Sequence, residues 1–292
     1  FATDPTRGGF ILFLLCLTVG GSLALYAWRA PTLKGGGLFQ PISREGALVF
    51  NNVLLSIAAA MVLLGTLYPL LLETLTGEKI SVGAPFFNST FVPIMTPLII
   101  AMAFGPMMPW KRADLFAVLG KLKIAIAAVI LVLIVTYWLA GGPAFALFGM
   151  GLAIWLFVGT MLEWAGRIKL FREPLSTSFR RMRNLPRSAH GTMLAHAGMA
   201  IVIAGITGSQ AWTEESVQSL AIGESTVVSG HTFTLSSLRE YQGPNFFARE
   251  ATITIATPGE RTITLTPEKR VYTVEGMPTT EAGIRSGFTG DI

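Results

Sequence analysis

Long apolar segments alternate with short polar ones over the first two thirds of the chain. About 20 apolar residues are needed to cross a bilayer hydrocarbon core about 30 Å thick. Six segments approach that length, and we expect each to be a membrane-spanning helix: residues 9–28, 47–72, 91–108, 124–140, 143–162 and 192–208. Because Pro93, Pro97 and Pro106 interrupt the third segment, we expect a bent or partly re-entrant helix there.

The pattern changes to a period of two from residue 210 onward. Polar and apolar residues alternate at 232–235, 252–255 and 262–265, as they do in half-buried strands. Pro258 and Gly259 form a turn signal between the last two stretches, so residues 251–266 predict a hairpin. The pattern therefore predicts an α-helical polytopic membrane protein in residues 1–209, followed by a small, mainly β domain in residues 210–292.

Composition supports this division. Hydrophobic residues make up 51% of the chain and charged residues 13%, with a mean hydropathy of +0.57. Soluble domains carry about 25% charged residues, so the deficit argues against a disordered chain, a nucleic-acid-binding protein or an ordinary cytosolic enzyme. Residues 1–209 hold 16 basic and 7 acidic residues, whereas residues 210–292 hold 6 and 10. The excess of positive charge therefore belongs to the helical part.

The distribution of basic residues among the loops predicts the orientation. Six crossings place the loops 29–46, 109–123 and 163–191 on one side, and together they contain 14 Lys and Arg residues. The other side has two outside the tail, Arg7 and Lys79. Cytoplasmic loops are enriched in Lys and Arg, so we expect the tail to lie in the periplasm of a bacterial inner membrane. We interpret the basic run 167–187 as an anchor near anionic headgroups.

The three histidines, His190, His196 and His231, are the main candidates for chemistry, because the sequence contains no HExxH, GxSxG, P-loop or GxGxxG motif. His231 precedes a predicted strand at a turn, and His190 lies at the mouth of the last span. His196 lies roughly 10–13 Å inside that span at about 1.5 Å per residue. Intramembrane ionisable residues are candidate functional sites. Haem ligation and a hydrogen bond to another helix are both open for His196.

The last span predicts two different faces. His190 and His196 are six residues apart, which places them about 120° from each other around a helix. A site with two histidine ligands therefore requires a histidine from outside this chain. Gly191, Gly198 and Gly205 form a small-residue stripe on the face opposite His196, and such a stripe suits close helix packing.

Two further features of the apolar segments have structural interpretations. Cys16 is the single cysteine, so it forms no disulfide within the chain, and we expect a small buried side chain. Asn51 and Asn52 lie near the start of the second span, where hydrogen bonding between helices is favoured over contact with a polar ligand.

Several strings of residues resemble the CcmF family, the haem lyase subunit of cytochrome c biogenesis. They are residues 43–56, 64–69, 80–88, 105–112 and 195–198 in the helical part, and 243–245, 267–270 and 279–282 in the tail. The similarity covers nearly the whole chain, in the order and with the spacing of the family. By this resemblance we expect the chain to be the C-terminal half of such a protein, cut at both ends and without the family's last span.

The resemblance implies a function and a set of partners. The family receives haem from the periplasmic haem chaperone CcmE and helps to attach it to the CxxCH motif of apocytochrome c, together with the subunits CcmH and CcmI. It also holds a b-type haem in the membrane, with quinol as an electron source. His196, in the Ala-His-x-Gly motif, matches one of the family's two transmembrane haem ligands. Membrane lipid is an expected partner, and nucleic acid is not.

Two points stay open at this stage. We hypothesise that Arg183 or Arg187 pairs with the haem propionates, since both lie at the cytoplasmic end of the span that carries His196. Anchoring of the topology is the competing interpretation of these arginines. The alternative functions are a non-catalytic haem exporter or assembly scaffold, and a paralogue dedicated to a multihaem nitrite reductase. A scaffold has no need for a histidine inside the span, so His196 favours the haem lyase.

Overall fold

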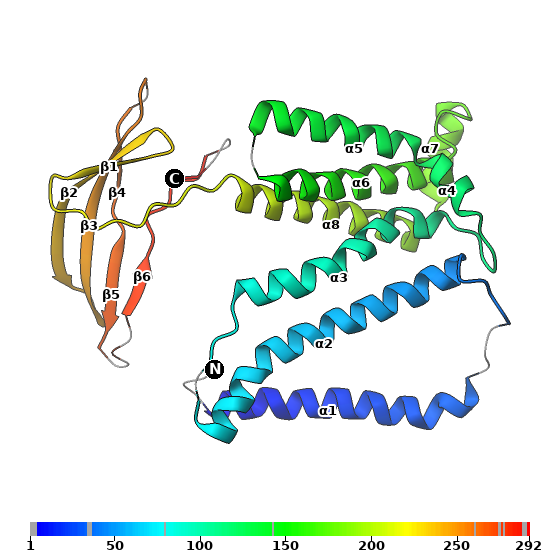
Figure 1. The fold of residues 1–292 in the computed structure, drawn as a ribbon, viewed down its shortest axis with the longest axis horizontal. Helices are drawn as coiled ribbons and strands as arrows, with labels where there is room; N and C mark the ends of the chain where they lie inside the picture. Colours follow the sequence, from blue (N-terminus) through cyan, green and yellow to red (C-terminus); the bar gives the residue numbers. More distant parts are fainter. Residues whose placement is uncertain are drawn as a thin grey trace. The chain divides into compact units, whose positions relative to one another are not determined.

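Helices dominate the first of two units, Phe1–Gly205, and strands dominate the second, Ile206–Ile292, in the computed structural model (Figure 1). The structure describes residues 5–33, 37–78, 80–141, 143–259, 261–273, 276, 278–287 and 291–292. The α-helices are α1 (Pro5–Arg29), α2 (Arg44–Thr76), α3 (Ala84–Phe104), α4 (Leu115–Lys121), α5 (Lys123–Val135), α6 (Ala144–Arg167), α7 (Leu175–Asn184) and α8 (Arg187–Ala211). Short helical turns are η1 (Ala30–Thr32), η2 (Gly105–Met107) and η3 (Thr136–Ala140).

Six of the described helices are long and apolar enough to cross a membrane: α1, α2, α3, α5 extended by η3, α6 and α8. The predicted polytopic helical class is therefore confirmed. The third helix begins at Ala84 rather than at residue 91, because Pro85 suits the first turn of a helix. It runs through Pro93 and Pro97 and becomes a tighter helical turn at η2. The structure therefore has a continuous helix where a re-entrant one was an alternative.

The core of the helical unit lies where α3, α6 and α8 meet. Ile99 of α3, Leu156 of α6 and Ala200 of α8 form one buried hydrophobic cluster. Gly159 permits the close approach of α6 to α3, since a Cβ atom at this position would lie 2.7 Å from the Cβ of Ala103. This packing fixes the three helices that carry most of the site described below.

Other helix faces of the unit are uncovered. Cys16 is exposed on α1, so the prediction that it is buried is wrong; no described residue of α1 is buried. On α8, Gly191, Gly198 and Gly205 have no neighbouring atom within 4 Å of an added Cβ. The predicted glycine stripe therefore exists, but within the described chain no helix packs on it.

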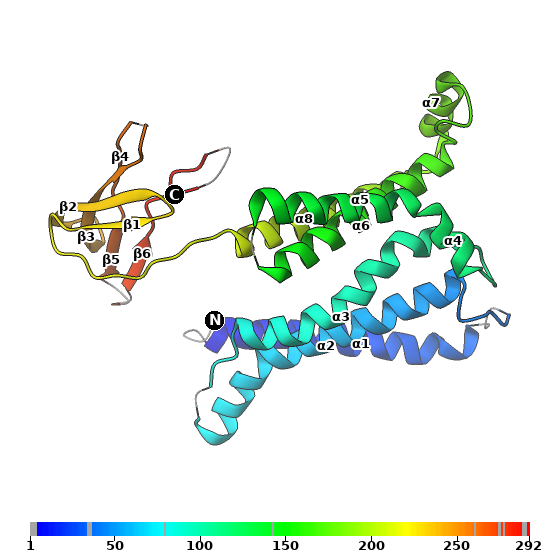
Figure 2. The same cartoon turned by 45° about the horizontal axis from the view of Figure 1, so that its top comes forward.

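The apolar pattern of the sequence does not predict the short helices α4 and α7. Asp114 begins α4 by accepting hydrogen bonds from the backbone N–H groups of Phe116 and Ala117. The polar helix α7 lies beyond the ends of α6 and α8 (Figure 2) and contains the arginines 180, 181 and 183.

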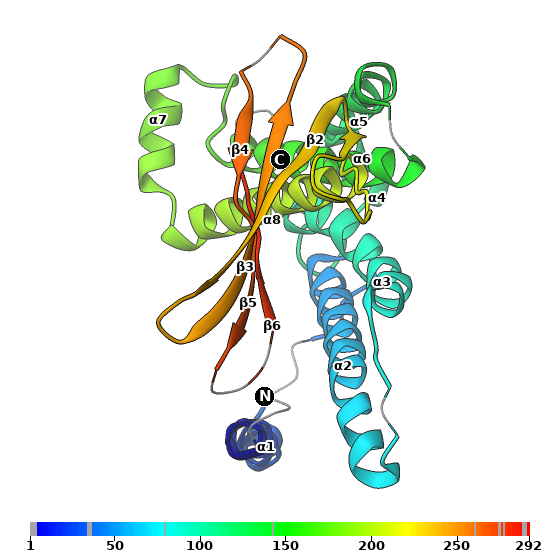
Figure 3. The same ribbon diagram turned by 90° about the vertical axis from the view of Figure 1, so that its left-hand side faces the viewer.

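The described strands of the second unit form one antiparallel sheet. They are β1 (Ser225–Val228), β2 (His231–Gln242), β3 (Phe246–Ala256), β4 (Ile263–Leu265), β5 (Glu268–Tyr272) and β6 (Pro278–Glu281). Their order is β1-β2-β3-β5-β6, and β4 pairs with β3 beyond the end of β5. Figure 3 shows the twist of the long strands β2 and β3. Leu235, Ala248 and Ile255 are its buried apolar residues.

The predicted hairpin of residues 251–266 is confirmed. Ile253 of β3 lies opposite Leu265 of β4, and the chain turns through Pro258 and Gly259, whose φ is +83°. A positive φ suits glycine, which has no Cβ. His231 begins β2 after the turn, as predicted, but it is half-buried rather than solvated, and its Nδ1 atom lies 2.7 Å from the hydroxyl of Thr257.

Candidate functional site

A cavity of about 460 Å³ lies inside the helical unit. Its walls come from the beginning of α2, the end of α3 with η2, the end of α6 and the beginning of α8. The lining residues are Arg44, Ala47, Leu48, Asn51, Leu98, Ala101, Met102, Gly105, Pro106, Arg167, Ser188, Ala189, Thr192 and His196. The volume is within the range of small-molecule and cofactor sites, about 300–1,000 Å³.

His196 is the deepest ionisable residue of α8 in this wall. It is half-buried and lies nine residues after the first residue of the helix, which is about 2.5 helical turns. Thr192 lines the same cavity one turn earlier. The predicted face of α8 that carries Thr192 and His196 therefore faces this space.

His190 lies on another face of α8. Its Nε2 atom is 3.0 Å from the backbone carbonyl oxygen of Met182, at the end of α7. It does not line the cavity. The two histidines of this helix therefore have different environments, as the helical spacing predicts.

Two arginines line the cavity together with His196. Arg44 is the first residue of α2, and its guanidinium carbon lies 4.9 Å from the centroid of the Trp110 ring. Arg167 is the last residue of α6 and forms an ion pair with Glu163, one turn earlier on the same helix. Arg44, Arg167 and His196 are far apart in the sequence, so their common position becomes visible only where α2, α6 and α8 line one cavity.

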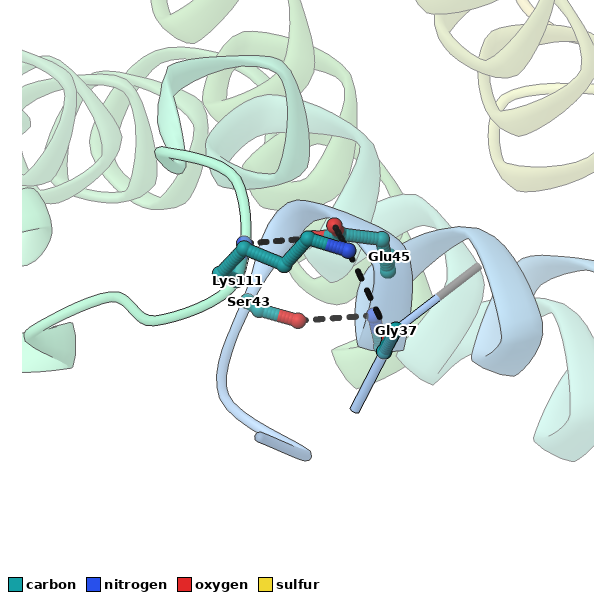
Figure 4. A network of polar contacts seen from close by, with 5 residues as sticks. Gly37, Ser43, Glu45 and Lys111 are labelled. Atoms are coloured by element: carbon teal, nitrogen blue, oxygen red, sulfur yellow. Dashed lines mark hydrogen bonds and ion pairs between the residues drawn. The ribbon is translucent and has the colours of Figure 1, made fainter. Parts of the chain in front are cut away.

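A network of polar contacts around Ser43, Glu45 and Lys111 fixes the start of α2 (Figure 4). The buried hydroxyl of Ser43 accepts a hydrogen bond from the backbone N–H of Gly46, at 3.0 Å. The Glu45 carboxylate accepts from the backbone N–H of Lys111, at 2.8 Å, and lies 3.4 Å from the Lys111 ammonium group. That ammonium group also donates to the carbonyl of Gly37, at 3.4 Å.

Backbone contacts reinforce this network. The N–H of Arg44 donates to the carbonyl oxygen of Pro109, at 3.0 Å. Gly46 lies so close to the preceding loop that an added Cβ would be 1.9 Å from the carbonyl oxygen of Pro41. The string Ser43-Arg-Glu-Gly46 is therefore a structural unit that holds the Arg44 side chain at the cavity.

The other predicted arginines lie elsewhere. Arg183 near the end of α7 and Arg187 at the start of α8 are both exposed, and neither lines the cavity. Arg181, which is half-buried, lies 3.7 Å from the carboxylate of Glu173. The basic segment around α7 thus presents its charge mainly away from the cavity.

The donors of the cavity suit a particular class of ligand. The wall offers one imidazole, two guanidinium groups and the amide of Asn51, which also donates to Asn52 at 3.2 Å. Leu48, Leu98 and Met102 supply apolar surface. No cluster of three or more His, Cys, Asp or Glu residues exists in the described part of the chain. The residues therefore fit an iron macrocycle, which brings its own in-plane ligands, better than a bare metal ion.

A second polar cluster lies in the sheet. The Tyr241 hydroxyl donates to Glu268 at 2.9 Å, and Arg270 donates to the same carboxylate at 2.8 Å. The hydrogen bond from Arg270 holds the pKa of Glu268 below its ordinary value, and the bond to Glu268 raises the pKa of Tyr241. Arg270 also lies over Phe246, 4.6 Å from its ring centroid. These groups satisfy one another, so the cluster has a structural role.

Comparison with known proteins finds a matching family model and several related sequences. Residues 211–292 match the family model described as the CcmF C-terminal beta-sandwich. The chain is 47% identical to the cytochrome c-type biogenesis protein CycK of Bradyrhizobium diazoefficiens over 285 residues, covering 97% of this chain and 43% of CycK. It is 35% identical to the cytochrome c-type biogenesis protein CcmF of Escherichia coli over 294 residues, covering 100% of this chain and 44% of that protein.

A solved structure, titled "Cytochrome c Heme Lyase CcmF", is similar in fold and sequence. It matches with a TM-score of 0.65 and 26% identity, covering 97% of this chain and 42% of the other. The chain is therefore similar to CcmF proteins over nearly its whole length. It spans less than half the length of these relatives. The resemblance of its short strings to CcmF is thereby confirmed.

Several of the strings that resemble CcmF lie at or beside the cavity. The string at 43–56 contains the Arg44 network, and the string at 105–112 contains η2 and Trp110. The string at 195–198 contains His196. Three segments that resemble the family thus border or support one cavity, although they are far apart in the sequence.

Proposed function

We propose that this CcmF-like chain forms part of the membrane subunit of the cytochrome c maturation haem lyase, and that the cavity binds a b-type haem with His196 as an axial ligand. The observation that carries the proposal is the half-buried imidazole of His196 in the wall of a cavity about 460 Å³ in volume. The names of the related proteins, which refer to cytochrome c biogenesis and to a haem lyase, support it.

The chain's own residues have three tasks in this proposal. The imidazole of His196 would hold the iron, and the side chains of Leu48, Leu98 and Met102 would provide apolar contacts to the macrocycle. A haem bound here supplies one-electron redox chemistry, which the ligand and the polarity of its pocket tune. A second histidine ligand would have to come from outside residues 1–292, since His190 is on another face and bonds to Met182.

The proposed partners follow from the same function. Haem is the substrate as well as a cofactor, delivered by CcmE and attached to apocytochrome c with the help of CcmH and CcmI. Thioether formation adds a cysteine S–H across a haem vinyl group, and it needs reduced thiols and reduced iron. A b-type haem beside the substrate, reduced by quinol, would keep the incoming iron in the ferrous state.

The proposed location is the bacterial inner membrane, with the sheet in the periplasm. The 14 basic residues in the loops 29–46, 109–123 and 163–191 support this orientation. Protease added to the periplasmic side of spheroplasts should cleave the sheet unit and spare the connection between α6 and α8. Cleavage of the sheet unit only from the cytoplasmic side would contradict the orientation.

The absorption spectrum of the intact protein tests the haem site. We expect His196→Ala to lose the b-type absorption bands, because no other histidine lines the described part of the cavity. His190→Ala is the matched control, since this residue lies six positions away on the same helix and bonds to a backbone carbonyl. An unchanged spectrum in His196→Ala would remove this residue from the site.

A further inference from the structure

We infer that Arg44 and Arg167 bind the carboxylate groups of the ligand that His196 holds. This inference rests on the proposed function and extends it to the anionic end of the ligand. Both arginines line the same cavity as His196, although they come from α2 and α6. The lining contains these two cationic groups and no acidic residue, as far as the chain is described. A cavity with this balance of charge favours an anionic ligand.

Arg44 has donor capacity left for a ligand. Its guanidinium group lies over the Trp110 ring, and a stacked arginine keeps its in-plane N–H donors available. Among the described residues, no carboxylate lies within ion-pair distance of Arg44, because the neighbouring Glu45 binds Lys111 instead. The network at the start of α2 therefore delivers a pre-positioned cation to the cavity wall.

Arg167 is only partly neutralised. Its ion pair with Glu163 engages the Nε atom, and a guanidinium group has five N–H donors. Its side chain retains 33% exposure and lines the cavity. The Glu163 carboxylate thus orients Arg167 along the helix and leaves other donors to bind an anion.

The side chains of the cavity wall together indicate the chemical class of the ligand. Arginine binds carboxylates through paired, charge-assisted hydrogen bonds. Two guanidinium groups, one imidazole and an apolar wall match an amphiphilic metal macrocycle with two carboxylate arms, which is the chemistry of haem and its propionates. The phosphate of an anionic lipid shares the negative charge, so the experiment must separate these two ligands.

The test compares haem retention in the intact protein among Arg44→Gln, Arg167→Gln and the double variant. The rate of haem transfer to excess apomyoglobin measures retention, and potentiometric titration measures the midpoint potential. Charge-assisted hydrogen bonds from arginine are stronger than neutral ones, so we expect about tenfold faster haem loss for each single variant, which corresponds to about 1.4 kcal/mol. The potential should fall, because removing positive charge favours ferric iron. Arg44→Lys and Arg167→Lys keep the positive charge and should recover part of the haem retention.

The matched control is the double variant Arg183→Gln/Arg187→Gln. These exposed arginines lie on α7 and α8 outside the cavity lining, so the control should keep haem loss and potential within twofold of the parent protein. If it loses haem faster than the Arg44 and Arg167 variants do, the arginines of the α7 segment hold the propionates and the inference is wrong. Membrane abundance, measured for each variant, separates misfolding from lost binding.

The remaining outcomes separate the inference from the proposed function. If His196→Ala loses the b-type bands but the Arg44 and Arg167 variants behave as the parent protein, the haem site stands and the carboxylate inference fails. If those variants lose co-purifying anionic lipid and retain haem normally, a phosphate headgroup is the ligand and the inference also fails. If His196→Ala keeps its bands, the proposed function fails first.

Discussion

Arg44 at the cavity and Arg270 in the sheet both lie against an aromatic ring, at 4.9 Å from Trp110 and 4.6 Å from Phe246. Their carboxylate partners differ. Arg270 lies 2.8 Å from Glu268 and 3.6 Å from Glu281. Among the described residues, Arg44 has no carboxylate partner, since its neighbour Glu45 is bound to Lys111.

The difference shows how the surroundings of an arginine distinguish a structural role from a binding role. In the sheet, two carboxylates pair with the Arg270 guanidinium group, and Arg270 in turn lowers the pKa of Glu268. At the cavity, the neighbouring carboxylate of Glu45 pairs with Lys111. The Arg44 guanidinium group therefore lines a space large enough for a ligand. Three changes test this contrast, in decreasing order of expected effect.

The largest effect should come from Gly46→Ala. The new Cβ would meet the backbone oxygen of Pro41 at 1.9 Å, which neither α2 nor the loop can avoid without moving. We expect a loss of stability of about 3 kcal/mol, together with loss of haem, because the Arg44 network is displaced. Thermal denaturation of the purified protein measures this loss.

Gly20→Ala is the control, since no atom lies within 4 Å of its added Cβ. It should be neutral or stabilise α1 by up to about 1 kcal/mol. Equal stability of the Gly46 variant and this control would show that the start of α2 is adaptable, and that Arg44 is not held in one position.

A smaller effect is expected from Trp110→Leu. A cation–π contact contributes about 0.5–1 kcal/mol at an exposed site, so haem should be lost up to about fivefold faster. The rate of transfer to apomyoglobin measures it, with Trp138→Leu as the control, because that ring is 77% exposed and lies in η3. A loss as large as that of Arg44→Gln would mean that Trp110 contacts the ligand itself.

The smallest effect on haem should come from Arg270→Gln, which tests the sheet side of the contrast. The lowered pKa of Glu268 means that its pairing stabilises the sheet above the ordinary value of 4.5, and that this contribution is lost as pH falls through the lowered pKa. Without Arg270, the sheet should be less stable at neutral pH, and this acid-dependent loss should become smaller, because the hydrogen bond from Tyr241 still lowers the pKa of Glu268. The haem spectrum should not change.

Resistance of the sheet to pepsin, followed from about pH 5 to about pH 2, measures this acid dependence. Arg249→Gln is the control, because Arg249 forms an exposed pair with Glu240 across the strands, and such pairs contribute little. An acid profile of Arg270→Gln identical to that of the parent protein would contradict a structural role for the Arg270 pair.

Hydropathy alone predicts most of the helical fold, because a membrane span requires a length of apolar sequence that few other structures need. The same signal misses α7, which is polar, and β5, which begins with three consecutive charged residues. Alternation predicts the hairpin of β3 and β4, since each strand has one face toward the small core of the sheet.

The candidate site is predictable only in part. The depth of His196 in an apolar segment is visible in the sequence and singles this residue out. Arg44 and Arg167 lie at the ends of spans, where the positive-inside rule already explains an arginine. Only the arrangement of α2, α3, α6 and α8 around the cavity distinguishes them from Arg183 and Arg187, which lie equally near the ends of spans in the sequence.

The most direct test of the central claim is chemical rescue of His196→Gly in the intact protein. Removing the side chain leaves a space that free imidazole can enter, so the account predicts that the variant lacks the b-type bands and regains them when imidazole is added. His190→Gly should keep its bands without imidazole. A full b-type spectrum of His196→Gly in the absence of imidazole would contradict the assignment of His196 as the iron ligand.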